Sequence, residues 1–552
     1  MINKINNFKE IVEKSYTISS PYLLQTALDK INADKKSLIS DLDNEKGIKV
    51  PVVGDFDAGK SSLINAFIGR KDLLPTAITP ETAVAYEMYF SIDEKIVHTR
   101  NCETLSSCGV DQIKSLATKP GDIVKVYVNS RAVKDLNDKG IVLVDMPGLG
   151  SGIEAHNNAI LNYMSKGCCF VFVVDCESGT LTSSTLSFMH ELSLYNLKCG
   201  VIVSKIDKKP EEDIPSLKEV MGYHAKKAVN SDVYVGAVSS AQGNTADFTS
   251  FLSSLDSESL VAEKFASKIA QFIDSQIFGI KTQIDVLNAN IEDVDEKLKE
   301  LQAQKDKIEK DLSGNVVNAD TPEKSTSDIL MAVENTLNEH AEDIARAIAD
   351  KQDTESIKSM ILSYVRPTIA QSFKEEGEQY ASSLNTVVDD ISKALQDCLQ
   401  IEDNDIVVLV DDFRSDIFNV VEIAAGALLN IPHVFAKILG GILLLLGEKI
   451  PDIVRWFFGK SNDEMLFEIV AKLKESVIVN ICDKLRPMIL EQVTAQQERI
   501  RKSISEGAQN KISQIQDSVR SSADNASKDE LNRKKEVLIK VVEQLQTIKS
   551  EI

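Results

Sequence analysis

One glycine-rich loop constrains the fold of this chain more than any other part of the sequence. Residues 52–62 read VVGDFDAGKSS and fit the pattern G-x-x-x-x-G-K-[ST]. An apolar run over residues 48–53 predicts a buried strand before the loop, and an amphipathic segment over residues 62–68 predicts a helix after it. A loop in this position points its backbone N–H groups at phosphate oxygens. The sequence therefore predicts a phosphate-binding loop at one edge of an α/β sheet.

The polar side chains of the loop have separate expected roles. Lys60 is expected to reach the β- and γ-phosphates, and the Ser61 hydroxyl is expected to bind Mg²⁺. A purely structural glycine turn is the alternative, and the complete match between a strand and a helix argues against it. The predicted nucleotide contacts in the loop are Gly54, Asp55, Phe56, Asp57, Ala58, Gly59, Lys60, Ser61 and Ser62.

A second motif indicates which base is bound. Residues 201–207 read VIVSKID, and S-K-x-D after an apolar strand is similar to the guanine-reading pattern [NT]-K-x-D. A carboxylate at Asp207 can accept two hydrogen bonds from guanine, whereas adenine offers no such pair of donors. The stem of Lys205 can lie along the base, and Ser204 keeps a hydroxyl where Asn or Thr is usual. The motif predicts a preference for guanine nucleotides.

Two further strand ends complete the predicted site. Residues 141–148 read IVLVDMPG, a buried strand that ends in D-x-P-G. Asp145 is expected to hold Mg²⁺ through water, and the Gly148 N–H is expected to bond the γ-phosphate. The apolar run 233–238 precedes Ser239–Ser240, which we interpret as the last nucleotide loop.

These elements together resemble a GTPase of the translation-factor-like class, and one loop resembles the dynamin-like proteins. Residues 73–83 read LLPTAITPETA. In the dynamin-like switch loop, an L-P pair is followed seven residues after the proline by a catalytic threonine. The resemblance assigns that role to Thr82, whose hydroxyl would complete the Mg²⁺ shell and whose carbonyl would orient the attacking water. Thr76 and Thr79 are competing candidates.

The sequence departs from the better-known relatives at the positions that orient water. Leu149 stands where Ras-type proteins carry a glutamine, and Phe56 stands where eukaryotic dynamins carry one. Phe56 favours the bacterial branch, which often reads G-[DE]-F-x-x-G-K-S. Asp57 stands where cation-activated GTPases carry Asn and dynamins carry Ser. Asp57 is therefore either a ligand for K⁺ or Na⁺ that replaces an arginine finger, or an outward-pointing or N–H-capping carboxylate. The predicted catalytic residues are Lys60, Thr82, Asp57 and Gly148.

Charge and cysteine usage restrict the partners and the compartment. The 552 residues carry a net charge of −22, which argues against nucleic acid as a partner, because binding phosphates requires clustered Lys and Arg. The eight cysteines form no C-x-x-C pair, which favours a reducing, cytoplasmic compartment. The first residues lack an apolar signal core, and no apolar run reaches 18 residues, so neither secretion nor a conventional transmembrane helix is expected.

The chain changes character near residue 256. Before that point strand-like and helical runs alternate, which predicts a mostly parallel sheet flanked by helices. After it, charged helical sequence dominates, with an apolar seam from Ile277 to Leu312 and a polar stretch over residues 313–327 that we interpret as a loop. Packing in an intramolecular bundle and an intermolecular coiled coil both fit this seam. The predicted regions are an N-terminal helical segment (1–45), a GTPase domain (46–255), an outgoing helical trunk (256–404), an apolar tip (405–460) and a returning trunk (461–552).

The apolar tip is the second marked shift in composition. Residues 423–436 and 438–447 carry no formal charge, and each stretch is too short to cross a bilayer. One interpretation is a hairpin that enters one leaflet, with aromatic and basic side chains at the interface. The other is burial within the bundle or against a partner protein. The far end of a long stalk offers little core, which favours the membrane. The predicted tip residues are Leu428, Leu429, Ile431, Phe435, Ile438, Leu439, Ile442, Leu443, Leu444, Leu445, Leu446 and Trp456.

This layout resembles the bacterial dynamin-like proteins. The resemblance implies an α/β P-loop GTPase domain with an extended all-α stalk, N-terminal helices that join the neck of that stalk, and GTPase domains that pair across their nucleotide faces. It further implies GTP, GDP and Mg²⁺ as ligands, dynamin-like partner proteins, hydrolysis that drives membrane remodelling, and a peripheral location on a membrane. Two alternatives are an Era-type regulatory GTPase that switches a protein partner, and a scaffold that binds GTP without hydrolysing it.

Overall fold

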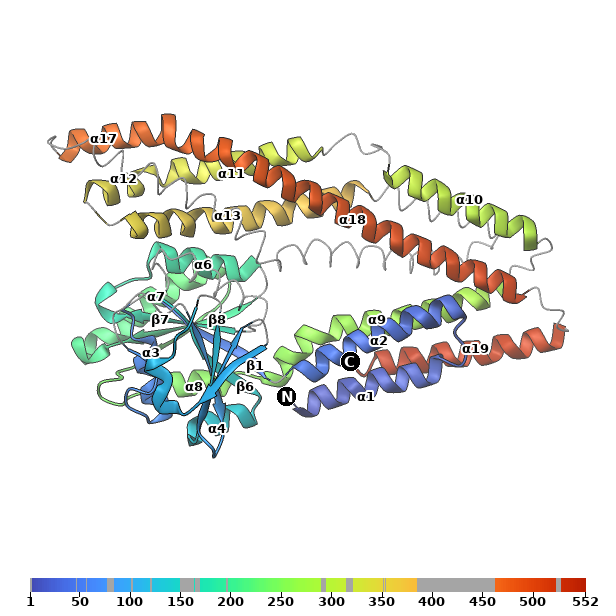
Figure 1. The fold of residues 1–552 in the computed structure, drawn as a ribbon, viewed down its shortest axis with the longest axis horizontal. Helices are drawn as coiled ribbons and strands as arrows, with labels where there is room; N and C mark the ends of the chain where they lie inside the picture. The colour runs from blue at the N-terminus through green and yellow to red at the C-terminus, as the bar shows by residue number, and fades with distance from the viewer. Residues whose placement is uncertain are drawn as a thin grey trace.

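The fold combines an α/β domain with two groups of long helices (Figure 1). The computed structural model describes residues 2–45, 47–55, 57–76, 84–100, 103–119, 122–148, 163, 169–194, 197–288, 294–313, 321–350, 352, 354–384, 462–522 and 528–552. The predicted α/β domain and the predicted helical region are both confirmed.

The α/β domain is built on one nine-stranded sheet in the order β4-β3-β5-β2-β6-β1-β7-β8-β9. Strands β6, β1, β7, β8 and β9 run parallel, while β2 is antiparallel to β6, and β3 is antiparallel to β4 and β5. The strands are β1 Ile48–Val53, β2 Ala85–Phe90, β3 Lys95–Arg100, β4 Glu103–Cys108, β5 Ile123–Val128, β6 Ile141–Asp145, β7 Cys169–Asp175, β8 Lys198–Ser204 and β9 Tyr234–Ala237.

The central strands are apolar on both faces because helices cover both faces. β7 reads CFVFVVD and is buried along nearly its whole length, as expected for a parallel strand inside an α/β domain. A short 3-10 turn at Val110–Ser115 connects β4 to β5, and others at Cys176–Ser178, Ile206–Lys208 and Glu211–Asp213 lie between strands and helices. The helices on one face are α3 Lys60–Ile68, α4 Arg131–Asp138 and α8 Ala246–Ser254, and those on the other are α6 Ser183–Leu194 and α7 Ile214–Val229.

One group of helices forms a neck beside the sheet (Figure 1). Its members are α1 Ile2–Ser19, α2 Gln25–Asn44, α9 Ser257–Asn288 and α19 Lys528–Lys549. Buried polar contacts fix their register: the Ser19 hydroxyl donates to Oε1 of Gln276 at 2.6 Å. Lys549 pairs with Asp274 across the bundle at 2.6 Å. The N-terminal helices therefore pack against the helix that leaves the α/β domain.

The second group forms a trunk, and one part of it lies over the α6 face of the sheet (Figure 1). Its members are α10 Val294–Ser313, α11 Pro322–Glu339, α12 Ala341–Ala349, α13 Thr354–Ser383, α17 Asn462–Lys472, a π-helical turn Leu473–Val477 and α18 Ile478–Ser522. Helix α18 contains 45 residues and contacts both the trunk helices and the neck helices α2 and α9.

The structure corrects the predicted boundaries of two helical segments. The stretch 313–327 is not wholly a loop, because α11 begins at Pro322. Thr321 caps this helix by accepting a hydrogen bond from the Lys324 N–H, and proline at the first helical position loses no bond. The predicted seam from Ile277 to Leu312 is divided between α9 and α10.

Several predicted features lie outside the described residues. They include Phe56, Thr82 with its competitor Thr79, Leu149, and the apolar tip at residues 405–460 with all of its predicted contact residues. No helix among the described residues combines the length and the apolar character that crossing a bilayer requires.

Candidate nucleotide site

The phosphate-binding loop follows β1 and leads directly into α3. Gly54 has φ +151°, and a Cβ on this residue would lie 2.1 Å from the carbonyl oxygen of Val173, so the loop cannot accept a side chain here. Gly59 has φ +84° and caps α3 in the left-handed conformation that glycine adopts readily. The two glycines therefore shape the backbone as the sequence motif requires.

Lys60 lies inside this loop and is 6% exposed. Its Nζ donates to the carbonyl oxygens of Gly54 at 3.0 Å and Asp55 at 2.8 Å. Burial lowers the pKa of Lys60, and the nearby carboxylates of Asp145 and Asp55 oppose that shift. A buried cation that donates to neutral carbonyl oxygens is an attractive partner for phosphate.

Ser61 in the first turn of α3 and Asp145 at the end of β6 bring oxygen atoms together. The Ser61 hydroxyl donates to Oδ2 of Asp145 at 2.6 Å, and the buried Oδ1 has no hydrogen-bond partner among the described residues. Burial raises the pKa of Asp145 to about 6, although Ser61 and Lys60 oppose the shift. An unpartnered carboxylate oxygen beside a hydroxyl fits Mg²⁺, which takes few protein ligands when it also binds phosphates. Within the described residues no cluster of three His, Cys, Asp or Glu side chains offers a separate metal cage.

The base-reading motif lies at the carboxyl ends of β8 and β9. Asp207 follows β8 and accepts a hydrogen bond from the Ser239 hydroxyl through Oδ1. Lys205 adopts φ +57°, and its Nζ pairs with Oδ2 of Asp175 at 2.7 Å. A Cβ built on Gly59 would lie 3.8 Å from Cε of Lys205, so the lysine stem lies beside the phosphate loop. The structure thus places Lys205 and Asp207 on the same edge of the sheet as Lys60.

Ser204 has a role that the sequence pattern did not reveal. Its hydroxyl is buried and donates to the carbonyl oxygen of Ala58 at 2.6 Å. Ser204 therefore ties the base-reading loop to the phosphate loop within the protein itself. The predicted direct contact of Ser204 with nucleotide stays a prediction.

The remaining predicted residues differ in exposure. Asp57 is exposed, Ser62 and Ser240 are half-buried, and Gly148 is buried three residues after Asp145. Their roles toward nucleotide and cation stay predictions.

Asp55 makes a contact that sequence reasoning missed. Its Oδ2 accepts from Oγ1 of Thr182 at 3.4 Å, and Oγ1 of Thr182 also accepts from the Thr185 N–H at the start of α6. Burial raises the pKa of Asp55, with Lys60 and Thr182 opposing the shift. Thr182 lies 127 residues beyond Asp55, so no local sequence signal connects them.

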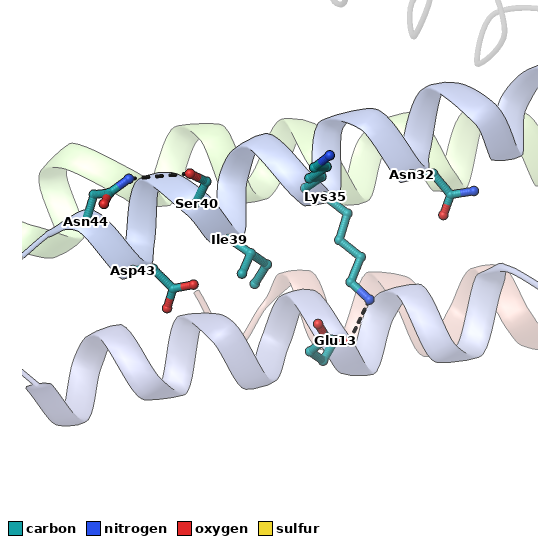
Figure 2. Close-up of a pocket in the computed structure, with 8 residues that line it drawn as sticks. Glu13, Asn32, Lys35, Ile39, Ser40, Asp43 and Asn44 are labelled. Carbon is teal, nitrogen blue, oxygen red and sulfur yellow. Dashed lines mark hydrogen bonds and ion pairs between the residues drawn. The ribbon is translucent and has the colours of Figure 1, made fainter.

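A groove of about 430 Å³ lies elsewhere, between α1 and α2 of the neck (Figure 2). Lys35 pairs with Glu13 across it at 2.7 Å. The lining residues are Glu13, Asn32, Lys35, Lys36, Ile39, Ser40, Asp43 and Asn44, and none belongs to a predicted nucleotide motif.

Comparison with known proteins agrees with this geometry. Residues 50–206 match the model of the dynamin family. An uncharacterized protein encoded in the xynA 3′ region of Caldicellulosiruptor sp. (strain Rt8B.4) is 25% identical over 206 residues, which are 35% of this chain and 50% of that protein. A probable transmembrane GTPase, FZO-like, from the chloroplast of Arabidopsis thaliana is 22% identical over 33% of this chain and 18% of its own length. Dynamin-like protein 2 of Campylobacter jejuni is 29% identical over 15% of each chain.

The chain therefore spans half or less of the length of the curated relatives it matches. Among solved structures, an oligomerised bacterial dynamin pair aligns over 98% of this chain and 95% of its own, at 13% identity and a TM-score of 0.33. Era of Aquifex aeolicus aligns over 42% of this chain and 67% of its own, at 14% identity and a TM-score of 0.24. A closer relationship to the labile enterotoxin output protein LeoA, which size and layout suggest, stays a prediction. Residues 50–206 of this chain are thus similar to the dynamin family, and the phosphate-loop geometry agrees with that match.

Proposed function

We propose that this protein hydrolyses GTP to GDP and phosphate and that its helical stalk couples the reaction to a membrane. One observation carries the enzymatic part. The phosphate-loop lysine, the Ser61–Asp145 pair and Asp207 all lie at the carboxyl ends of β1, β6 and β8, which run parallel in one sheet. This is where α/β proteins bind nucleotides.

Each site residue has one proposed role in binding the nucleotide or a cation. Lys60 exchanges its carbonyl partners for the β- and γ-phosphates, and Asp207 accepts hydrogen bonds from guanine. Ser61 and Asp145 hold Mg²⁺, which neutralises charge on the phosphates when bound. The Gly148 N–H and Thr82 contact the γ-phosphate side, and Asp57 holds a monovalent cation.

Replacing Lys60 tests the enzymatic proposal most directly. Lys60→Ala should abolish tight GTP binding and lower hydrolysis by about 100-fold or more, because it removes the charge that the buried loop presents to phosphate. The matched control is Lys71→Ala, at an exposed lysine just beyond α3. Normal binding and turnover in Lys60→Ala would contradict the proposal.

Base preference tests Asp207 separately. Asp207→Asn should move the preference from guanine toward xanthine, because an amide can donate to the additional carbonyl of xanthine. Competition of GTP and XTP for the variant measures the change. Unchanged use of GTP would show that Asp207 does not read the base.

Rates of GTP turnover test both the pairing of GTPase domains and the monovalent cation. Pairing of GTPase domains predicts that turnover per molecule rises with protein concentration, whereas an isolated switch gives a flat profile. A cation at Asp57 predicts faster turnover in K⁺ or Na⁺ than in choline at equal ionic strength. Equal rates in the three salts would exclude the cation.

Membrane contact is proposed for the two uncharged stretches at residues 423–436 and 438–447, which Lys437 separates. Flotation with phosphatidylcholine–phosphatidylethanolamine vesicles should be lost in Leu443→Asp and Leu444→Asp, because each carboxylate would have to enter hydrocarbon. The control is Ile92→Asp, at a position that is 78% exposed on the α/β domain. Equal flotation of all variants and the parent would argue for burial of the tip against protein.

The coupling route that we propose runs through α6. Thr182 contacts Asp55 of the phosphate loop where this helix begins. Near its other end, Glu191 accepts a hydrogen bond from Nε of Arg366 on α13 at 2.6 Å, with side-chain exposures of 0% and 7%. The guanidinium also lies 4.9 Å from the ring centre of Phe188. One helix thus contacts the predicted phosphate site and the trunk at once, which supports α6 as the connection between them.

A further inference from the structure

A buried carboxylate connects the two parts of the sheet. The order β2-β6-β1 places β6 between the strand that carries Glu87 and the strand that carries Lys49. The backbone ladder between β2 and β6 is short, with only the pairs Tyr86–Asp145 and Glu87–Val144, whereas β2 pairs with β5 over six residues. The sheet half that begins with β2 is thus joined to the phosphate-loop half by a narrow backbone contact.

Side chains strengthen this narrow junction. Nζ of Lys49 reaches across β6 to Oε2 of Glu87 at 3.2 Å and to the hydroxyl of Tyr89 at 2.5 Å. The Tyr89 hydroxyl donates to the same Oε2 at 2.8 Å, and the Tyr163 hydroxyl donates to Oε1 at 2.7 Å. Glu87 is 5% exposed, and Lys49 is 15% exposed. Burial raises the pKa of Glu87, but Lys49 and the two hydroxyls outweigh it and leave the pKa below its usual value.

The position of this cluster relative to the site gives it more than a packing role. Strand β2 begins at Ala85, three residues after Thr82, and Tyr86 lies opposite Asp145 in the ladder. Tyr163 follows Gly148 by 15 residues and is 1% exposed. Glu87 therefore connects three parts of the chain. They are β1, which leads into the phosphate loop; β2, which follows Thr82; and Tyr163, which follows the D-x-P-G motif.

We infer that Glu87 is a positioning residue for the γ-phosphate side of the nucleotide site. Its carboxylate fixes β2 against β1 and Tyr163, and it thereby anchors the strand that follows Thr82 and the residue that follows the D-x-P-G motif. This inference rests on the proposed function. The inference goes beyond the proposed function by assigning a role in hydrolysis to a residue that is not among the predicted nucleotide or metal contacts.

The test compares Glu87→Gln with Glu103→Gln, a matched change at an exposed position on edge strand β4. We expect Glu87→Gln to lower kcat about 10- to 100-fold, because small displacements of reacting groups cost that much. The affinity for GDP should stay within about threefold of the parent's. The preference for a non-hydrolysable GTP analogue over GDP should be lost, because only that preference requires the γ-phosphate side.

Tyr163→Phe removes one hydrogen bond and should give a smaller loss in kcat, about three- to tenfold, corresponding to one hydrogen bond. The double variant should be no slower than Glu87→Gln, because both changes act through one contact. If Glu87→Gln does not fold, Tyr163→Phe and Glu87→Asp decide the matter, and Glu87→Asp should recover part of the rate. A kcat in Glu87→Gln or Tyr163→Phe within twofold of Glu103→Gln, or multiplicative losses in the double variant, would overturn the inference.

The outcomes separate this inference from the proposed function. If the parent protein is as inactive as Lys60→Ala, the proposal of hydrolysis is wrong. The role of Glu87 is then decided by whether Glu87→Gln loses the parent's preference for the GTP analogue over GDP. A parent that is active while Glu87→Gln matches its control overturns the inference and leaves the proposed function in place.

Discussion

The long helices contact the α/β domain at two places, and the two contacts differ in kind. At the neck, α9 packs an apolar face that includes Phe265 into the cluster beneath β1, while its ion pairs Lys264–Glu45 and Lys268–Asp41 lie toward the surface. At the trunk, α13 packs on α6 around Arg366 and Glu191, an ion pair that is almost fully buried.

This difference indicates which contact can open. An apolar face gains nothing from exposure to water, so the neck contact is expected to persist. A buried ion pair forfeits the hydration of both charges, and the second oxygen of Glu191 has no hydrogen-bond partner among the described residues. Burial also raises the pKa of Glu191, even though Arg366 opposes the shift. Water would therefore stabilise both groups if the trunk moved away from α6.

The largest effect is expected at the neck. Phe265→Ala should lower the free energy of unfolding by about 3–5 kcal/mol, because it leaves a cavity under the sheet. Denaturant unfolding of the full chain measures this change. Tyr223→Ala, at a position that is 66% exposed, is the control and should cost less than about 0.5 kcal/mol. If Phe265→Ala lowers the free energy of unfolding by less than about 1 kcal/mol, the neck contact is no more stable than the trunk contact.

The second effect concerns the trunk alone. Arg366→Met leaves the Glu191 carboxylate buried without its partner, which costs on the order of 3 kcal/mol, so α13 should separate from α6. Hydrogen exchange should then rise in residues 183–194 and 354–383 but stay unchanged in α9. Adding Glu191→Leu should restore protection, because an apolar pair removes the stranded charge. Rising exchange in α9 as well would mean that the two contacts open together.

A smaller change tests the connection to the phosphate loop. Thr182→Val removes the bond to Asp55 and the hydroxyl that accepts from the Thr185 N–H, at a cost of about 1 kcal/mol. The difference in α6 protection between GDP and a GTP analogue should shrink in this variant and persist in Thr182→Ser. An undiminished difference in Thr182→Val would place the coupling elsewhere.

The smallest effect is expected from the surface of the neck. Lys268→Ala should cost about 0.2–1 kcal/mol, because its pair with Asp41 is half-exposed and screened by salt. Repeating the unfolding of both proteins at high salt should remove the difference. A larger cost that resists salt would mean that charge contributes to the neck as it does to the trunk.

The sequence predicted well those features that depend on residues close together in the chain. The phosphate loop, the strand that ends at Asp145 and the strand that ends at Ser204 each combine an apolar run with polar residues at fixed spacing. The start of α11 was also readable, since Thr321-Pro322 is a helix-start signal, but the polar composition of the surrounding stretch obscured it.

The contacts that escaped prediction join residues far apart in the chain. Lys49 contacts Glu87 across the intervening strand β6, which requires the strand order β2-β6-β1. Arg366 contacts Glu191, which lies 175 positions earlier in the chain. Such pairs depend on strand order, register and the direction in which the trunk turns back. None of these is encoded by local spacing.

Helix α18 is a long arm of the molecule, in which Pro487 removes one backbone hydrogen bond near the N-terminal end. Its 45 residues form one continuous helix that lies along the trunk at one end and against α9 of the neck at the other (Figure 1). At 1.5 Å per residue it is about 68 Å long, so a tilt of roughly ten degrees at one end would sweep the opposite end through about 12 Å. Angular changes of up to about ten degrees can therefore become displacements that approach the width of a helix, about 10–12 Å.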